Sequence, residues 1–215
     1  FNSQMQAAGI DAQYGLVLMP SPVGFSDDPT QVQDIVDFAT FTAPGSPFQT
    51  IPITGATERG SDAILEALNL FDPDAGPTTF NYRPGSRIVP ILLTNEDDDS
   101  TTQAAIDAQA ALLSTNSLFY AIADPLFFNT ASTYGTFATS TGGQLFDINN
   151  FLLDPTNFFN TMTADLIGQI AVGAAGQGIL VENYATTTIL NNIVANTSTA
   201  IDLQSSGGIP NVVGA

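Results

Sequence analysis

The chain has 215 residues, of which 44% are hydrophobic, so it is long enough and apolar enough to bury a sizeable core. It carries three arginines against 21 acidic residues, and its formal net charge of −18 argues against nucleic acid or an anionic membrane surface as a partner. It contains no cysteine and no histidine, which excludes disulfides, thiol nucleophiles, histidine acid–base chemistry and ordinary zinc sites. Divalent cations and cationic protein surfaces remain compatible with this charge.

The first residues and the longest apolar runs indicate whether the chain carries a signal peptide or a membrane-spanning segment. No apolar run reaches the roughly 20 residues that a membrane-spanning helix needs, and no signal-peptide pattern is visible, so we expect no membrane insertion. The first residues have the spacing of an amphipathic helix, and Phe1 would already lie inside it. We therefore expect that the chain has been cut from a longer one.

The first half of the chain predicts one strand and two helices. Residues 14–19 form a short apolar run that is typical of a strand. Asp28, followed at once by Pro29 and three residues after the cap by Gln31, has the pattern of a helix start. A second helical pattern covers residues 61–70. The residues expected on one helical face are Val32, Ile35, Val36 and Ala39 in the first of these helices, and Ile64, Ala67 and Leu68 in the second.

The second half alternates strands and helices. The continuous apolar run at 88–93 predicts a strand buried on both faces of a parallel sheet, and residues 118–123 and 144–148 predict two more strands. Ser100 is placed to cap a helix that ends at Leu113. Asp154 followed by Pro155 begins a last helix. This alternation predicts an α/β fold, a doubly wound and mostly parallel sheet flanked by helices. The expected inward residues are Ile106, Ala110 and Leu113 in one helix, and Phe159, Met162, Leu166 and Ile170 in the other.

The sequence changes in character after residue 172. Helical spacing disappears, asparagine and threonine become frequent, and the segments 178–181 and 200–203 resemble each other at a separation of 22 residues. This spacing fits one coil of a parallel β-helix, in which Ile179 and Val181 would stack under Ile201 and Leu203. One coil cannot bury its own faces, so residues 173–215 would begin a longer β-helix or pair with another chain. We therefore predict one domain at 1–172 and a β-rich tail at 173–215.

Four segments before residue 172 together resemble the segments of one known domain family. They are FNSQMQAAGIDAQYGLVLM at 1–19, GATERGSDAILEAL at 55–68, RPGSRIVPILLTNEDDDS at 83–100 and ATSTGGQLFD at 138–147. In order and spacing they resemble a von Willebrand factor A-like domain that lacks its first strand. The tail segment at 179–208, ILVENYATTTILNNIVANTSTAIDLQSSGG, resembles pectate-lyase-like β-helix repeats.

The first resemblance implies a metal-ion-dependent adhesion site at the carboxyl edge of the sheet, which holds Mg²⁺ or Ca²⁺ and binds an oxygen of a partner. The first of its three motifs would precede Phe1, Thr57 matches the second, and Asn95 stands where the third has aspartate. With Asp97, these residues are the candidate metal ligands. Thr57, Glu58, Asn95 and Glu96 are the candidate partner-binding residues.

The acidic run that follows the strand at 88–93 has several readings. Residues 96–99 could be a solvated loop whose charges favour the N-terminal dipole of the next helix. They could instead form a calcium site through Asp97 or Asp99, or a pair of hydrolytic carboxylates. Glu58 beside Arg59 predicts a local ion pair or another contact that stabilises the loop.

In the family that the chain resembles, the missing first strand lies in the middle of the sheet. The strands at 14–19 and 88–93 would then flank a gap with unpaired backbone groups. Three sources could fill it: the rest of a longer chain, a strand donated by a neighbouring subunit, or the tail segment at 188–195.

These resemblances imply a non-enzymatic adhesion or protein-interaction module, extracellular or at a cell surface, that binds a protein ligand. The alternative is a structural subunit of an extracellular filament, a homo-polymer held together by strand donation between chains. A third class, a polysaccharide lyase or hydrolase with a longer β-helix, is disfavoured because such lyases use basic residues and the tail contains none.

Overall fold

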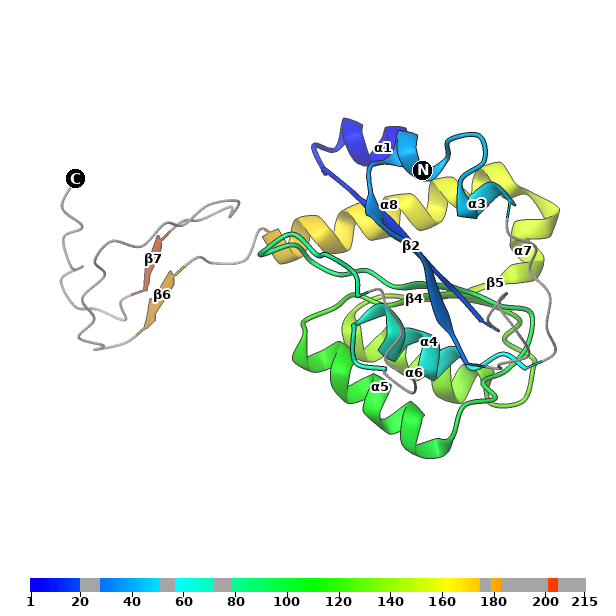
Figure 1. The fold of residues 1–215 in the computed structure, drawn as a ribbon. Helices are drawn as coiled ribbons and strands as arrows, with labels where there is room; N and C mark the ends of the chain where they lie inside the picture. Colours follow the sequence, from blue (N-terminus) through cyan, green and yellow to red (C-terminus); the bar gives the residue numbers. More distant parts are fainter. Residues whose placement is uncertain (20–27, 51–56, 72–78, 175–178, 183–200, 205–215) are drawn as a thin grey trace. The chain divides into compact units, whose positions relative to one another are not determined.

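The computed structural model describes residues 1–19, 28–50, 57–71, 79–174, 179–182 and 201–204 (Figure 1). The chain divides into two compact units, Phe1–Thr163 and Ala164–Ala215. The predicted boundary at 172 falls within a helix that ends at Ala174. Each unit is described separately below.

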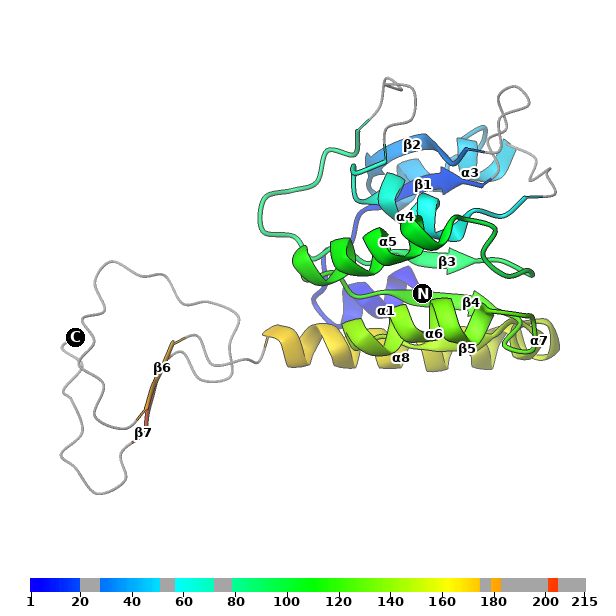
Figure 2. The same cartoon turned by 90° about the horizontal axis from the view of Figure 1, so that it is seen from below.

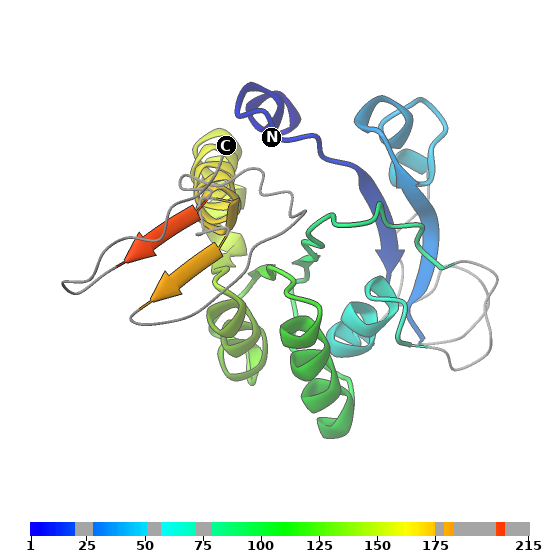
Figure 3. The ribbon, with the colours of Figure 1, turned by 90° about the vertical axis from the view of Figure 1, so that its left-hand side faces the viewer.

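The centre of the first unit is a three-stranded parallel sheet. Its strands are β3 (Ile91–Leu93), β4 (Tyr120–Ala123) and β5 (Leu145–Asp147), in that order, with Leu92 opposite Ala121 and Ile122 opposite Phe146. Three helices, α4 (Gly60–Ala67), α5 (Thr102–Ser114) and α6 (Thr130–Thr141), cover one face, and α1 (Asn2–Ala7) lies on the other side (Figure 3). The fold is therefore mixed α/β with a small parallel sheet flanked by helices, as the sequence predicts.

The core of this unit lies between the sheet and the three helices. Leu112, Phe119, Ala121 and Tyr134 have no exposed surface. Small residues on α5 allow it to approach α4 closely, which increases the dispersion contacts of both helices. The remaining buried core residues are Ile64, Leu65, Leu68, Leu92, Ala104, Ala108, Ala111, Ala123, Phe137 and Ala138.

The helix predicted from Asp28 is wrong. Residues 30–36 instead form strand β2 (Thr30–Val36), which pairs antiparallel with the correctly predicted β1 (Tyr14–Leu18). The β-branched residues of this segment favour a strand and outweigh its cap-like start. Tertiary contacts also hold it, because the Gln31 side chain donates to the carbonyl of Glu66 at 3.2 Å and to Asn69 Oδ1 at 3.0 Å. A short helix, α2 (Phe38–Phe41), begins only after β2, capped by Asp37.

The two sheets of this unit are not joined in the described part of the chain. Hydrogen bonds pair β1 with β2, and β3 with β4, but no ladder links β1 to β3. Figure 2 shows the strands in the order β2, β1, β3, β4, β5. The expected break between the strands at 14–19 and 88–93 is therefore present, while its predicted cause, a missing strand, stays a prediction.

Strand β3 is shorter and less covered than predicted. It spans only Ile91–Leu93, directly after Pro90, which cannot donate a backbone hydrogen bond. Leu92 points into the core, but Ile91 and Leu93 remain 39% and 55% exposed. Side chains alternate along a strand, so the helices cover one face of β3 and leave its other face open. The prediction of a strand buried on both faces is wrong.

The predicted inward face of α5 is also wrong. Ile106 and Leu113 are 56% and 53% exposed, and Ala110 is exposed too. The buried residues are Ala104, Ala108, Ala111 and Leu112. The inward face of α5 therefore consists of three alanines, which allow close packing, together with the single large side chain of Leu112. The cap is Thr101, whose Oγ1 accepts from the Ala104 amide at 3.1 Å, and Ser100 has another role described below.

Helix α6 was not predicted, because its sequence is rich in threonine and contains tyrosine and phenylalanine, all of which favour strands. Its buried side chains do have helical spacing, at Thr130, Tyr134, Phe137 and Ala138. Several hydroxyls bond carbonyls of their own helix, for example Thr136 Oγ1 to Ser132 O at 2.6 Å and Thr139 Oγ1 to Gly135 O at 2.7 Å. These bonds satisfy the hydroxyls within the helix.

The remaining elements of the first unit surround the two sheets. They are α3 (Pro47–Thr50), α7 (Ile148–Leu153) and the first part of α8 (Pro155–Ala174). The last helix begins at Pro155 as predicted, and Met162 is buried in its first part; Leu166, also buried, belongs to the second unit. Its inward aromatic residue is Phe158, at 6% exposure, whereas the predicted Phe159 is 36% exposed.

In the second unit, β6 (Ile179–Glu182) and β7 (Ile201–Gln204) pair in parallel. Ile179 lies opposite Ile201 and Val181 opposite Leu203, which is the predicted register. The segment at 188–195 and the expected asparagine ladders lie outside the described residues, so the β-helix stays a prediction. Across the described residues, none of the helices combines the length and the apolar character needed to span a bilayer.

Candidate functional site

The candidate site lies at the carboxyl edge of the parallel sheet. Because β3, β4 and β5 run in the same direction, the loops that follow them emerge at one edge, where α/β folds commonly bind ligands. The loop after β3 occupies residues 94–101. Its first residue, Thr94, is buried; its amide donates to Ile122 O at 3.0 Å, and its Oγ1 accepts from the Glu96 amide at 3.1 Å.

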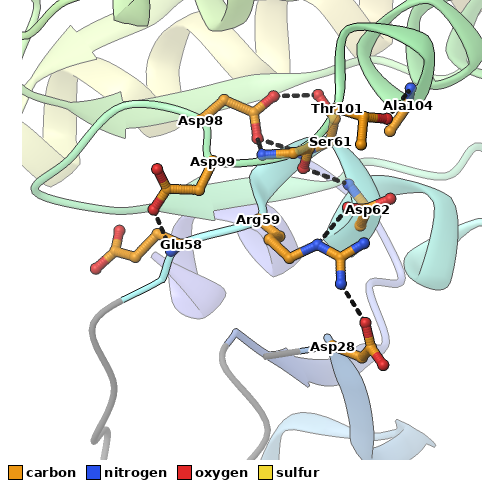
Figure 4. Close-up of polar contacts among 10 residues, drawn as sticks. Asp28, Glu58, Arg59, Ser61, Asp62, Asp98, Asp99, Thr101 and Ala104 are labelled. Carbon is orange, nitrogen blue, oxygen red and sulfur yellow. Dashed lines mark hydrogen bonds and ion pairs between the residues drawn. The ribbon is translucent and has the colours of Figure 1, made fainter. Parts of the chain in front are cut away.

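Asp98 caps helix α4 from this loop. Its carboxylate accepts from the Ser61 amide at 3.1 Å, from the Ser61 hydroxyl and from the Ser100 amide at 3.1 Å (Figure 4). Ser61 is fully buried, so water cannot replace these bonds. Ser100 Oγ accepts from the next amide of α4, that of Asp62, at 3.2 Å. The loop thus supplies the cap that Arg59, the residue preceding α4, does not provide.

Asp99 fastens the same loop to Glu58. The Asp99 amide donates to the Glu58 carbonyl at 2.9 Å, and the Glu58 amide donates to Asp99 Oδ2 at 3.0 Å. Two of the three consecutive aspartates therefore bind backbone amides at and before the start of α4. The prediction placed these charges at the N-terminus of the following helix, α5, whereas the structure ties Asp98 and Asp99 to the start of α4.

Arg59 does not form the predicted ion pair with Glu58. Its guanidinium instead pairs with Asp28 and, at 2.7 Å, with Asp62, as Figure 4 shows. It also lies over the ring of Phe71, 5.7 Å from the ring centre. The alternative reading, a contact that stabilises the loop, is the one the structure supports.

Glu58 is the carboxyl group at this edge whose pKa departs most from its usual value. Burial, followed by the nearby charges of Glu96 and Asp99, raises the pKa of Glu58 to about 7. Its Oε2 atom is buried and has no hydrogen-bond partner among the residues that the structure describes. A carboxyl group of this kind gains its charge near neutral pH, so the charge of the edge changes with pH in that range.

Tyr134 of α6 lies beneath the acidic loop and was not predicted. Its side chain is fully buried, and within the described part of the chain its hydroxyl has no hydrogen-bond partner. The hydroxyl packs so closely on Gly60 that a Cβ there would lie 2.1 Å from it. Burial, with smaller contributions from Asp98 and other acids of the loop, raises the pKa of Tyr134 well above its usual range. The sequence offers no signal for this contact except the glycine before Ser61.

The predicted ligands share this edge but do not form a complete cation cage. Glu58 is held against Asp99, Asn95 is exposed, and Thr57, Glu96 and Asp97 are partly exposed. In the described ranges, no three acidic side chains gather as a group that could hold a metal ion. Asp98 and Asp99 already accept backbone hydrogen bonds. Any cation here would need further oxygen ligands from outside these residues.

Searches of protein-family models, of curated proteins and of solved structures found no match to this chain. The resemblances to a von Willebrand factor A-like domain and to pectate-lyase-like repeats therefore stay predictions from the residues quoted above.

Proposed function

We propose that this chain is a non-enzymatic interaction module of an extracellular or surface protein, and that the acidic edge binds a protein ligand. The acidic edge is defined here as Glu58, Glu96, Asp97 and Asp99. The supporting observation is that Glu58 and Asp99 are fixed to each other through backbone bonds, so the charges stand on an ordered loop. Ordered surface charge steers and selects a partner of opposite charge.

The arginines of the chain are already paired with other groups than the carboxylates of the acidic edge. Arg59 pairs with Asp28 and Asp62, Arg83 pairs with Asp11, and Arg87 donates to the Asn116 carbonyl. The sequence contains no other arginine or lysine. A basic side chain at the acidic edge would therefore come from a partner.

The test uses a fluorescently labelled octalysine peptide as a cationic probe, with anisotropy measured at low salt. We expect Asp97→Asn to weaken binding about two- to threefold, the size of one exposed charge contact. The matched control is Asp107→Asn, which removes one exposed charge from α5. Equal effects of the two variants would show that only net charge matters and would refute binding at the acidic edge.

For the cation, we propose that Mg²⁺ or Ca²⁺ binds weakly through Thr57, Asn95 and Asp97, with a partner supplying further oxygen. Calorimetric titration with CaCl₂ and with MgCl₂ tests this ligand set. Asn95→Asp adds a formal charge and should tighten binding about tenfold, whereas Asp107→Asn should leave it unchanged. An Asn95→Asp variant that binds no better than the wild type would remove Asn95 from the set.

One observation favours the second candidate, a filament subunit joined by strand donation. Within the described residues, β1 pairs only with β2 and β3 only with β4, so each has an edge available for another strand. Ile91 and Leu93 also leave an apolar face beside that edge. Light scattering over a range of concentrations tests it: the wild type should polymerise, and Leu93→Lys should remain monomeric. A wild type that stays monomeric throughout would refute donation between chains.

A further inference from the structure

The loop between β4 and α6 exposes three consecutive large apolar side chains. Leu126, Phe127 and Phe128 are 90%, 46% and 79% exposed. Single exposed apolar residues are ordinary on protein surfaces, but a contiguous group commonly marks an interaction site. We call these three residues the apolar loop.

The apolar loop is held in place by its own backbone contacts. Asp124 Oδ1 accepts from the Leu126 amide at 2.9 Å, and the Asp124 carbonyl accepts from the Phe127 amide at 3.2 Å. At the other end, the Thr130 amide donates to the Phe127 carbonyl at 3.3 Å, and Asn129 adopts a left-handed conformation with φ of 67°. Because the loop is ordered before binding, a partner would pay little of the entropy cost of fixing it.

The position of the apolar loop links it to the acidic edge. β3 and β4 are adjacent parallel strands, so the loops that follow them leave the sheet at the same edge. After the next strand, β5, helix α7 adds Leu152 and Leu153, which are 70% and 82% exposed. The carboxyl edge of the sheet therefore carries carboxylates after β3 and large apolar side chains after β4 and β5.

This combination selects the chemistry of the partner. An anionic lipid surface, or the same edge of a second copy, would bring like charges against the acidic edge when the apolar loop is buried. A protein surface with an apolar pocket bordered by lysine or arginine would satisfy both features. Aromatic side chains buried in such a pocket typically dominate an interface energetically.

We infer that Leu126, Phe127 and Phe128 are the apolar anchor through which this edge holds a basic protein partner. The inference rests on the proposed function and adds the residues that supply most of the binding free energy. It also predicts that the interaction depends on apolar contacts as well as on salt.

The experiment compares octalysine with a helical peptide built only of leucine and lysine, with one apolar and one basic face. We expect Phe128→Ser to weaken binding of the leucine–lysine peptide about tenfold and to leave octalysine binding unchanged. The matched control is Leu70→Ser. Leu70 is 57% exposed and follows α4, whose C-terminus points to the opposite edge of the sheet.

Each result has a defined meaning. If Phe128→Ser and Leu70→Ser weaken the leucine–lysine peptide equally, the anchor is refuted, even where Asp97→Asn shows that the acidic edge binds. If Phe128→Ser alone weakens it while Asp97→Asn matches its own control, the anchor holds and the proposed acidic site fails. Wild-type binding to phosphatidylserine vesicles, or a concentration-dependent mass that Phe128→Ser abolishes, would assign the loop to a membrane or to a second copy and overturn the inference.

Discussion

Replacing Asp98 with alanine should destabilise the first unit far more than replacing either acid beside it in the sequence. The substitution removes the acceptor for the Ser61 amide, the Ser61 hydroxyl and the Ser100 amide. Ser61 is fully buried, so both of its donors would lose their partner without gaining water. Each buried unsatisfied group costs about 1–3 kcal/mol, so the expected loss for the two Ser61 donors is about 2 kcal/mol at the low end of that range and about 4 kcal/mol at its middle.

Thermal unfolding followed by circular dichroism measures this loss. For a unit of this size, each kcal/mol corresponds to about 2–4 °C, so Asp98→Ala should lower Tm by about 5–15 °C. Asp97→Ala removes the same charge one residue earlier and should change stability by less than about 0.5 kcal/mol. If the two variants unfold within 2 °C of each other, approximately the cost of 0.5–1 kcal/mol, the capping role of Asp98 is refuted.

Three further variants test other contacts. In urea unfolding, Glu58→Gln should be more stable than the wild type above pH 7 and equal to it near pH 4. In the native wild type, Glu58 keeps its proton up to about pH 7, whereas in the unfolded chain its pKa is 4.5. The contribution of protonated Glu58 to wild-type stability is therefore complete below pH 4.5 and is lost as the pH rises through 7. The difference in unfolding free energy between Glu58→Gln and the wild type is at most about 3 kcal/mol, and about 1–2 kcal/mol after allowing for the partial exposure of Glu58. If this difference is the same at both pH values, the burial of the Glu58 carboxyl is contradicted. Tyr134→Phe should leave stability unchanged or raise it by up to about 1 kcal/mol, because no described residue bonds the lost hydroxyl, and a loss above about 2 kcal/mol would contradict this. Gly143→Ala would place a Cβ 1.9 Å from the Phe119 carbonyl oxygen and should cost more than about 2 kcal/mol in the same assay, whereas Gly168→Ala, with open space around it, should not.

Two strands of the parallel sheet could be predicted because the segment of β4 is a continuous apolar run and the segment of β5 follows a Gly-Gly turn signal. Residues 118–123 and 144–148 contain β4 and β5 for this reason. The segment from Asp28 was predicted to be a helix because its first residues have the pattern of a helix cap. The residues that stabilise it as a strand, Glu66 and Asn69, lie more than 30 residues away in the sequence. Local pattern cannot reveal such a contact.

The sequence allowed the location of the candidate site in the fold to be predicted, but not the contacts that its residues make. The acidic residues after β3 could be assigned to the carboxyl edge because that edge follows from strand direction. The sequence does not show that Asp98 caps the earlier helix α4, since the two segments meet only in the fold. Nor does it show that Tyr134 lies beneath the loop, because Tyr134 comes from a helix whose residues favour strands.

The composition of α6 affects both the folding of this protein and its tendency to aggregate. Between Asp124 and Asp147 the chain has no charged side chain, and its threonines and aromatic residues prefer extended structure. The helical form is therefore stabilised by packing of Tyr134 and Phe137 in the core. Before that packing forms, or after heating disrupts it, the segment is an uncharged, strand-prone stretch of the kind that nucleates aggregation. We expect this segment to determine how long partly folded molecules stay soluble.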